Sequence, residues 1–188
     1  MRVIGIDGGA SKAAGALVTR IDNKTFKIDG DIIEKSYSDQ NHFIHNFEPL
    51  ELQIQKNKSP LSSIEVKQGK AYIKTIISII EKLMTEDSAL ISIAMPGIKT
   101  RNKQGIDIMA NGPRIPNLNR EITDYFGKSI KIINLQSDAE MCAWGEEFSK
   151  NGSFRKINNA CYIGGGTGIA DGLKLKNKIC SLKRCLAG

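Results

Sequence analysis

The sequence lacks the features of a membrane-spanning, exported or disulfide-rich protein. No apolar run approaches the roughly 20 residues that a membrane helix requires, and the start Met1-Arg2-Val3 has no signal-peptide design. The four cysteines form no Cys-x-x-Cys pair, which removes the usual spacing of zinc and redox motifs. We therefore expect reduced cysteines, no membrane partner and a cytoplasmic protein.

Acidic residues are fewer than basic ones. The chain has 27 Lys and Arg against 20 Asp and Glu, a formal charge of +7 and an isoelectric point near 9.2. Such a balance favours anionic ligands. The lysines are dispersed along the chain, which is typical of a solvated surface, so we expect no specific nucleic-acid partner.

The apolar pattern predicts strands and helices that alternate, which indicates an α/β protein with a parallel component. A polar, aperiodic segment at 38–66 is expected to be an insertion or long loop, and a lid over the cleft is one role for it. The expected strands are 2–6, 14–18, 32–37, 89–95, 130–135, 160–163 and 169–174, and the expected helices are 69–84, 119–126 and 139–148.

Two glycine-rich turns, each preceded by an apolar strand, predict a pair of loops that hold one phosphate chain. Glycine permits positive φ and has no Cβ, so backbone N–H groups can converge on an anion. The carboxylate of Asp7 in the first turn indicates Mg²⁺ held through water, although a turn aspartate bonded to its own loop is the simpler alternative. Lys12 fits a phosphate contact or a surface charge. The candidate phosphate residues are Asp7, Gly8, Gly9, Ser11, Lys12, Gly166, Thr167 and Gly168.

The order of the motifs between these turns resembles the ROK family of sugar kinases, which includes glucokinases and sugar-responsive repressors, in the actin-like ATPase superfamily. The similar segments are Met95-Pro96-Gly97, Asn111, the run 138–146 and Gly166-Thr167-Gly168-Ile169. The resemblance implies a ribonuclease H-like domain, with a mixed five-stranded sheet flanked by helices, over 1–157. It also implies that 158–188 begins a second, truncated ATPase domain.

The resemblance further implies an ATP-dependent sugar kinase that uses ATP and Mg²⁺ and phosphorylates a hexose or amino sugar. Asp138 matches the general base, and Asn111, Ser137 and Glu146 match positions beside the sugar. A carboxylate between a strand and the first turn of a helix suits that role independently, since it can be exposed and oriented. The simpler alternative makes Asp138 a helix N-cap, and Glu146 fits a structural role as well.

Departures from the family pattern leave other functions open. Ser137 stands where the family has Asn, and Ala170-Asp171 replace two glycines. The alternatives are a non-catalytic ROK-type sugar sensor, and an activator-type ATPase or N-acetylglucosamine-kinase relative. An isolated first domain would also expose an apolar face, which favours a homodimer.

Overall fold

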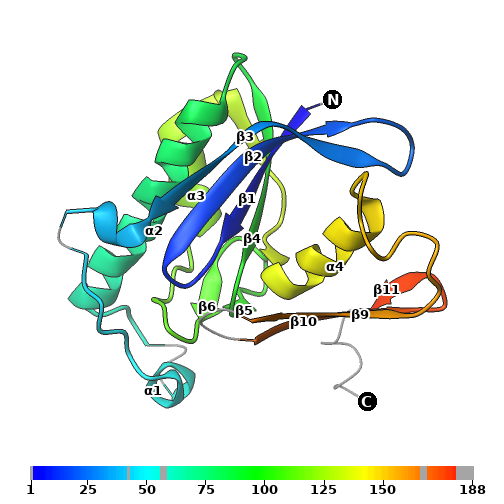
Figure 1. Cartoon of the computed structure of the whole chain (residues 1–188). Helices are drawn as coiled ribbons and strands as arrows, with labels where there is room; N and C mark the ends of the chain where they lie inside the picture. Colours follow the sequence, from blue (N-terminus) through cyan, green and yellow to red (C-terminus); the bar gives the residue numbers. More distant parts are fainter. Residues whose placement is uncertain (1, 42, 56–58, 166–168, 181–188) are drawn as a thin grey trace.

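A mixed six-stranded sheet forms the centre of the computed structural model, which describes residues 2–41, 43–55, 59–165 and 169–180 (Figure 1). The strand order is β3-β2-β1-β4-β7, and β8 also pairs with β4. The first three strands are antiparallel neighbours, while β4 runs parallel to β1, and β7 and β8 run parallel to β4. Their bounds are β1 Arg2–Gly8, β2 Lys12–Arg20, β3 Phe26–Ser36, β4 Ala89–Met95, β7 Ile130–Ile132 and β8 Gln136–Ser137.

The expected α/β class with a mixed, helix-flanked sheet is confirmed, whereas the count of five strands is wrong. The single strand expected at 130–135 ends at Ile132, and a second short strand begins at Gln136. Both pieces pair with β4, at Ala89–Ile91 and at Ala94–Met95. The edge of the sheet is therefore split into two strands that continue along the same neighbour.

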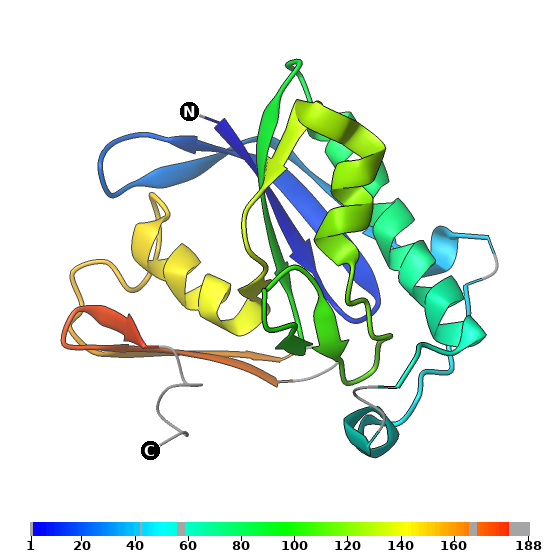
Figure 2. The ribbon, with the colours of Figure 1, turned by 180° about the vertical axis from the view of Figure 1, so that it is seen from behind.

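Helices cover both faces of this sheet. The helices α2 (Ser63–Leu83) and α3 (Leu118–Phe126) lie on one face, and α4 (Asp138–Phe148) lies on the other, as Figures 1 and 2 show from opposite sides. The apolar stripe of α2 packs into the main core because its residues recur every three or four positions. That core joins isoleucines of the helix to isoleucines of β1 and β4, namely Ile76, Ile79, Ile80, Ile4, Ile6, Ile91 and Ile93.

The start of α2 lies earlier than the sequence pattern indicates. The helix begins at Ser63 rather than at residue 69, because Ser62 and Glu65 form a capping box. The Ser62 hydroxyl accepts from the Glu65 amide at 3.2 Å, and the Glu65 carboxylate accepts from the Ser62 amide at 3.0 Å. In this first turn Glu65 is buried while Ile64 and Val66 are exposed, so apolar periodicity alone does not reveal it.

The segment 38–66 contains short helices and packs against α2. It contains the end of the short 3₁₀ helix η1 (Tyr37–Asp39), the helix α1 (Leu50–Gln55) and the start of α2. The Gln68 amide donates to the backbone carbonyls of Ile44 and Asn46, at 3.1 and 2.8 Å. These bonds fix the segment against α2.

A separate three-stranded sheet packs beneath α4 and comprises β9 (Ala160–Gly165), β10 (Ile169–Leu175) and β11 (Lys178–Cys180). Gly172 permits the contact, because a Cβ there would lie 2.6 Å from the Cβ of Ala143 in α4. Lys174, which is 1% exposed, donates to Glu147 of α4 at 2.5 Å and to the Phe154 carbonyl at 2.9 Å. The small sheet and α4 are therefore tightly joined.

Three short elements complete the described chain. The strands β5 (Ile98–Lys99) and β6 (Ile106–Ile108) pair antiparallel just after β4, and the 3₁₀ helix η2 (Gly127–Ser129) follows α3. No helix within the described residues combines the length and apolar character that a bilayer span needs. Cys142, Cys161 and Cys180 are free thiols, as expected.

Candidate functional site

The carboxyl ends of three parallel strands bring the two candidate aspartates to one edge of the sheet. Asp7 lies opposite Ala94 of β4, and Ala94 lies opposite Gln136 of β8. Asp138 begins α4 two residues after Gln136. We call Asp7, Ser137 and Asp138 the strand-end site. This edge is where open α/β sheets commonly bind ligands.

The Asp7 carboxylate is exposed at the strand-end site. Its pKa is raised above the usual value, chiefly by partial desolvation and next by the negative charge of Asp138, while Lys12 lowers it. The described residues donate no hydrogen bond to this carboxylate, so the expectation of a turn aspartate bonded to its own loop is not supported. Asp7 and Asp138 both lie at the carboxyl ends of neighbouring strands, so the two carboxylates share one edge of the sheet.

A pair of stacked tyrosines holds the first glycine-rich turn. The rings of Tyr37 and Tyr72 have centroids 3.6 Å apart. Their hydroxyls donate to the backbone carbonyls of Gly9, at 3.4 Å, and Ala10, at 2.6 Å. The turn itself is closed by the Gly9 amide, which donates to the Lys12 carbonyl at 2.9 Å. The buried tyrosines therefore fix the orientation of the backbone beside Asp7.

The glycines of this turn are needed for space rather than for unusual backbone angles. Neither Gly8 nor Gly9 has a positive φ, so the conformational argument made from the sequence is wrong here. A Cβ on Gly8 would lie 2.0 Å from the sulfur of Met95 in β4, which no side chain tolerates. A Cβ on Gly9 would lie 3.3 Å from the Lys12 carbonyl.

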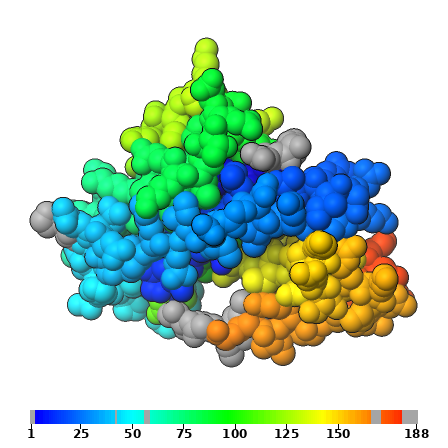
Figure 3. Space-filling model, turned by 45° about the horizontal axis from the view of Figure 1, so that its top comes forward, coloured from blue at the N-terminus to red at the C-terminus, as the bar shows by residue number. Residues whose placement is uncertain are grey.

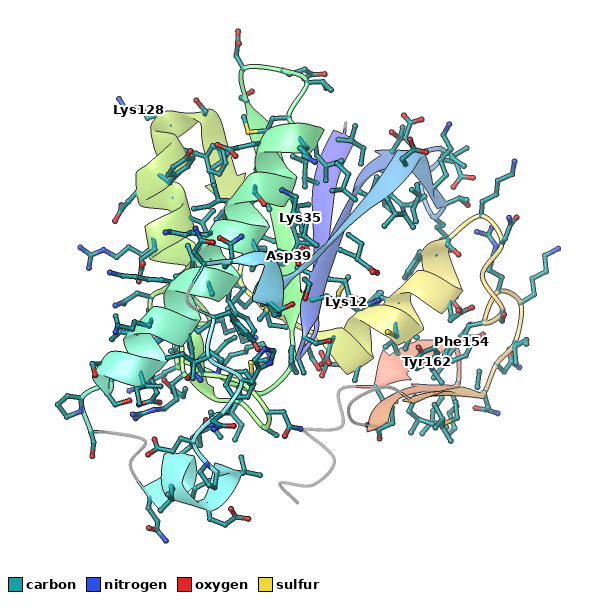
Figure 4. The ribbon with its side chains drawn as sticks, turned by 60° about the vertical axis from the view of Figure 1, so that its left-hand side comes forward. Lys12, Lys35, Asp39, Lys128, Phe154 and Tyr162 are labelled. Carbon is teal, nitrogen blue, oxygen red and sulfur yellow. The ribbon has the colours of Figure 1, made fainter. Side chains whose placement is uncertain are left out.

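Lys12 and Ser11 follow the turn at the start of β2. Lys12, labelled in Figure 4, forms an ion pair with Glu34 of β3 at 2.8 Å, and both side chains are more than half exposed. The Ser11 carbonyl accepts from the Tyr37 amide at 3.0 Å, and its side chain is exposed. Both residues thus keep side chains at the surface, where a phosphate could reach them.

Asp138 is the first residue of α4 and does not cap the helix. Ser137 occupies the N-cap position, without a capping hydrogen bond from its own side chain, so the expectation that Asp138 is an N-cap is wrong. The described residues give the Asp138 carboxylate no hydrogen bond or ion pair. A half-buried carboxylate with free acceptor capacity can take a proton from a ligand.

Tyr162 of β9 and Cys142 of α4 join this site, although the sequence patterns did not indicate them. The interaction between the Tyr162 hydroxyl and the Cys142 thiol raises the pKa of Tyr162, and the charges of Glu146 and Asp7 add to it. Burial raises the pKa of Cys142, which the charges of Asp7 and Asp138 also raise. Tyr162, labelled in Figure 4, lies on β9 of the small sheet, which packs against α4. No motif spacing links residues so distant in sequence.

The surface is hollowed between the first hairpin and the small sheet. Figure 3 shows open space between the dark-blue residues of the β1–β2 hairpin and the orange residues of the small sheet. Asp7 and Tyr162 lie on these two sides. The three residues expected to form the second phosphate loop, Gly166, Thr167 and Gly168, lie outside the described residues.

Asn111 reaches the same edge of the sheet through the loop that follows β6. A Cβ on Gly97, two residues after the end of β4, would lie 2.2 Å from the Ile108 carbonyl and 3.0 Å from the Cα of Met109. Asn111 is exposed two residues beyond Met109 and adopts a left-handed backbone, with φ of 56°. Since Met95 pairs with Ser137, this loop and Asp138 lie at the carboxyl end of the same strand.

Glu146 lies near the other end of α4. Its carboxylate accepts from the Ser153 amide at 2.8 Å, and its carbonyl accepts from the Phe154 amide at 3.0 Å. These bonds hold the turn after the helix, which gives Glu146 a structural role. Its charge also raises the pKa of Cys142 and of Tyr162.

The carboxylates of the strand-end site suit a cation that is held mainly by the phosphates of a bound substrate and by water. Within the described ranges, no three His, Cys, Asp or Glu side chains gather as a metal-binding cluster. Mg²⁺ needs no such cluster, because it keeps several waters and takes one or two carboxylates together with substrate phosphates. Asp7, exposed and repelled by Asp138, fits that pattern, since a nearby cation would offset the repulsion.

Solved structures share this fold, although no family model and no curated protein matches the sequence. A putative sugar kinase from Cytophaga hutchinsonii matches with a TM-score of 0.58 at 17% identity, over 96% of this chain and 50% of that one. A ROK family glucokinase from Streptomyces griseus, solved with glucose and AMPPNP, matches with 0.58 at 18%, over 96% and 46%. An inorganic polyphosphate/ATP-glucomannokinase from Arthrobacter matches with 0.61 at 14%, over 95% and 60%.

These matches define the class of fold. The chain shares the fold of one portion of these sugar kinase structures, and it spans about half the length of the first two. Sequence identities this low support a shared fold alone, so the activity of this chain has to be argued from the residues of its own site.

Proposed function

We propose that this chain takes part in the ATP-dependent phosphorylation of a sugar hydroxyl, with a hexose or an amino sugar as acceptor. The observation that carries the proposal is the Asp138 carboxylate, which accepts no hydrogen bond from the described residues and lies at the same sheet edge as Asp7, in a fold found in sugar kinases. A ribonuclease H-like first domain over 1–157, and a second domain that begins near 158, are part of the same proposal. The separate small sheet from Ala160 onward supports that division.

In this proposal Asp138 is the general base. Its carboxylate accepts the proton of the sugar hydroxyl while that oxygen attacks the γ-phosphorus, and ADP leaves. Positioned general bases contribute about 10²- to 10⁴-fold to the rate. Ser137 precedes the base and Asn111 lies in the loop at the same strand end, so both suit contacts to sugar hydroxyls.

The phosphates of ATP would lie in the hollow between the two hairpins. Gly8, Gly9, Ser11 and Lys12 would hold them on one side, and the loop 166–168 on the other. Mg²⁺, bound through water to Asp7, would neutralise phosphate charge. Phosphoryl transfer needs little beyond such positioning and charge neutralisation, so a site with one base and one exposed carboxylate is sufficient.

The test measures ADP release by the whole polypeptide that the gene encodes, with Mg-ATP and a panel of hexoses and amino sugars. At least one sugar should be phosphorylated, and Asp138→Asn should lower kcat by about 100-fold or more. Asp124→Asn is the matched control, because Asp124 is an exposed aspartate of α3 that pairs with Arg120 on the same helix. Failure with every sugar, or an unchanged rate for Asp138→Asn, would sink the proposal.

This assay, together with a direct measurement of sugar binding, separates the alternatives. ATP hydrolysis that needs no sugar would indicate an activator-type ATPase. Sugar binding without phosphorylation would indicate a sugar sensor.

A further inference from the structure

A polar pocket lies beside the Asn111 loop, and the segment 45–50 forms its other wall. Its volume is about 370 Å³, and its lining includes Asn111, Ala110 and residues 45–50. Ligand pockets of this kind commonly measure about 300 to 1,000 Å³. The polar side chains are those of His45, Asn46, Glu48 and Asn111, with Phe47 between them.

Both walls of the pocket are held by buried polar contacts. Gln53 of α1 is fully buried, and its amide nitrogen donates to the carbonyls of Met109 and Gly112, at 3.0 Å each. Its amide oxygen accepts from the Met109 amide at 2.9 Å, and its nitrogen also donates to the Glu48 carbonyl at 2.9 Å. One side chain therefore joins the segment 45–50 to the loop that carries Asn111.

A buried ion pair anchors the far end of the same loop. Arg114 donates to both oxygens of Glu65, at 2.6 and 2.8 Å, and each side chain is 3% exposed. With Gln53 at one end and this pair at the other, the left-handed backbone at Asn111 is held in place. Preorganised walls lower the entropy that a ligand must lose on binding.

The chemistry of the lining suits a small polyhydroxylated molecule. Amide, carboxylate and imidazole groups offer both donors and acceptors, which the hydroxyl groups of a sugar require. Phe47, which is half-buried, adds an apolar surface for the C–H face of a ring. The lining includes no lysine or arginine and does include the Glu48 carboxylate, so a phosphate or another anion is a poor fit.

We infer that the segment 45–50 determines which sugar is accepted, with His45 and Asn46 contacting the part of the sugar that points away from Asp138. This inference rests on the proposed function. It adds a binding wall from the segment after η1, which no motif had connected to the sugar.

The variants His45→Ala and Asn46→Ala test this wall. Both side chains are exposed, and the hydrogen bond of Asn46 to Gln68 uses its backbone carbonyl, so the fold should persist. Asn41→Ala is the matched control, because Asn41 is exposed nearby and does not line the pocket. Sugar binding is measured by saturation-transfer NMR on the full chain, and kcat/KM is measured for two epimeric sugars.

The lining variants should change the ratio of kcat/KM between the two sugars by up to about tenfold, the effect of one lost hydrogen bond. KM for Mg-ATP should stay unchanged, as should both values for Asn41→Ala. If sugars are phosphorylated and the ratio does not move, the inference is overturned while the proposed function stands. If a sugar binds without phosphorylation and the lining variants weaken that binding, the pocket stands and the kinase proposal fails. If no sugar binds, the inference is overturned.

Discussion

Replacing Arg114 by Met should be among the most destabilising single changes in this protein. The substitution leaves the Glu65 carboxylate buried, 3% exposed, without the guanidinium that now donates to both of its oxygens. Removing one partner of such a pair costs about 3 to 5 kcal/mol, because the remaining charge stays desolvated. For an m-value of about 2 kcal/mol/M in urea, the unfolding midpoint should fall by about 1.5 to 2.5 M.

Urea unfolding followed by circular dichroism measures this shift. Arg120→Met is the control, since the Arg120–Asp124 pair is 3.6 Å long and exposed, and should contribute less than about 1 kcal/mol. The double change Glu65→Leu with Arg114→Met should recover part of the loss, since no unpaired charge remains. If Arg114→Met and Arg120→Met cost the same, the argument from burial is refuted.

The pH dependence gives an independent check on the same pair. The hydrogen bonds from Arg114 lower the pKa of Glu65 below its ordinary value. A lowered folded pKa means that this contribution is fully present above the pKa of the unfolded carboxyl group and is lost as pH falls through the folded pKa. The acid limb of the stability curve should therefore flatten in Arg114→Met.

Two further predictions concern the strand-end site and the small sheet. The pKa of Asp7 in the folded protein is raised, chiefly by partial desolvation and next by the charge of Asp138, so its charged form costs stability above the unfolded pKa. Asp7→Asn should therefore raise the urea midpoint at pH 7 and weaken Mg-ATP binding, and a lower midpoint would contradict this. Gly172→Ala should lower the free energy of unfolding by about 1 to 3 kcal/mol, because the new Cβ overpacks against Ala143. Gly165→Ala is the control, since its Cβ would meet nothing within 4 Å and should leave the melting temperature unchanged. Equal melting temperatures for the two variants would contradict the predicted packing.

Local pattern was sufficient for most of the secondary structure. The strand at 89–95 and the helix at 119–126 lie within one residue of their observed bounds, because apolar periodicity marks elements that bury one face. Apolar periodicity was insufficient where hydrogen bonds of polar side chains set the bounds or the position of a helix. The capping box at Ser62 and the buried amide of Gln53 leave no apolar signal, so the start of α2 and the whole of α1 were missed.

What the sequence by itself determined is the set of parts: an α/β chain, a glycine turn after an apolar strand, and an aspartate between a strand and a helix. Those features depend on residues that are close together in the chain, and such local patterns can be seen directly in the sequence. Only the tertiary structure decided that Asp7 and Asp138 share one edge of the sheet, that Tyr162 interacts with Cys142, and that the segment 45–50 and Asn111 line one pocket. These contacts join residues far apart in sequence, and their geometry follows from strand pairing and buried hydrogen bonds.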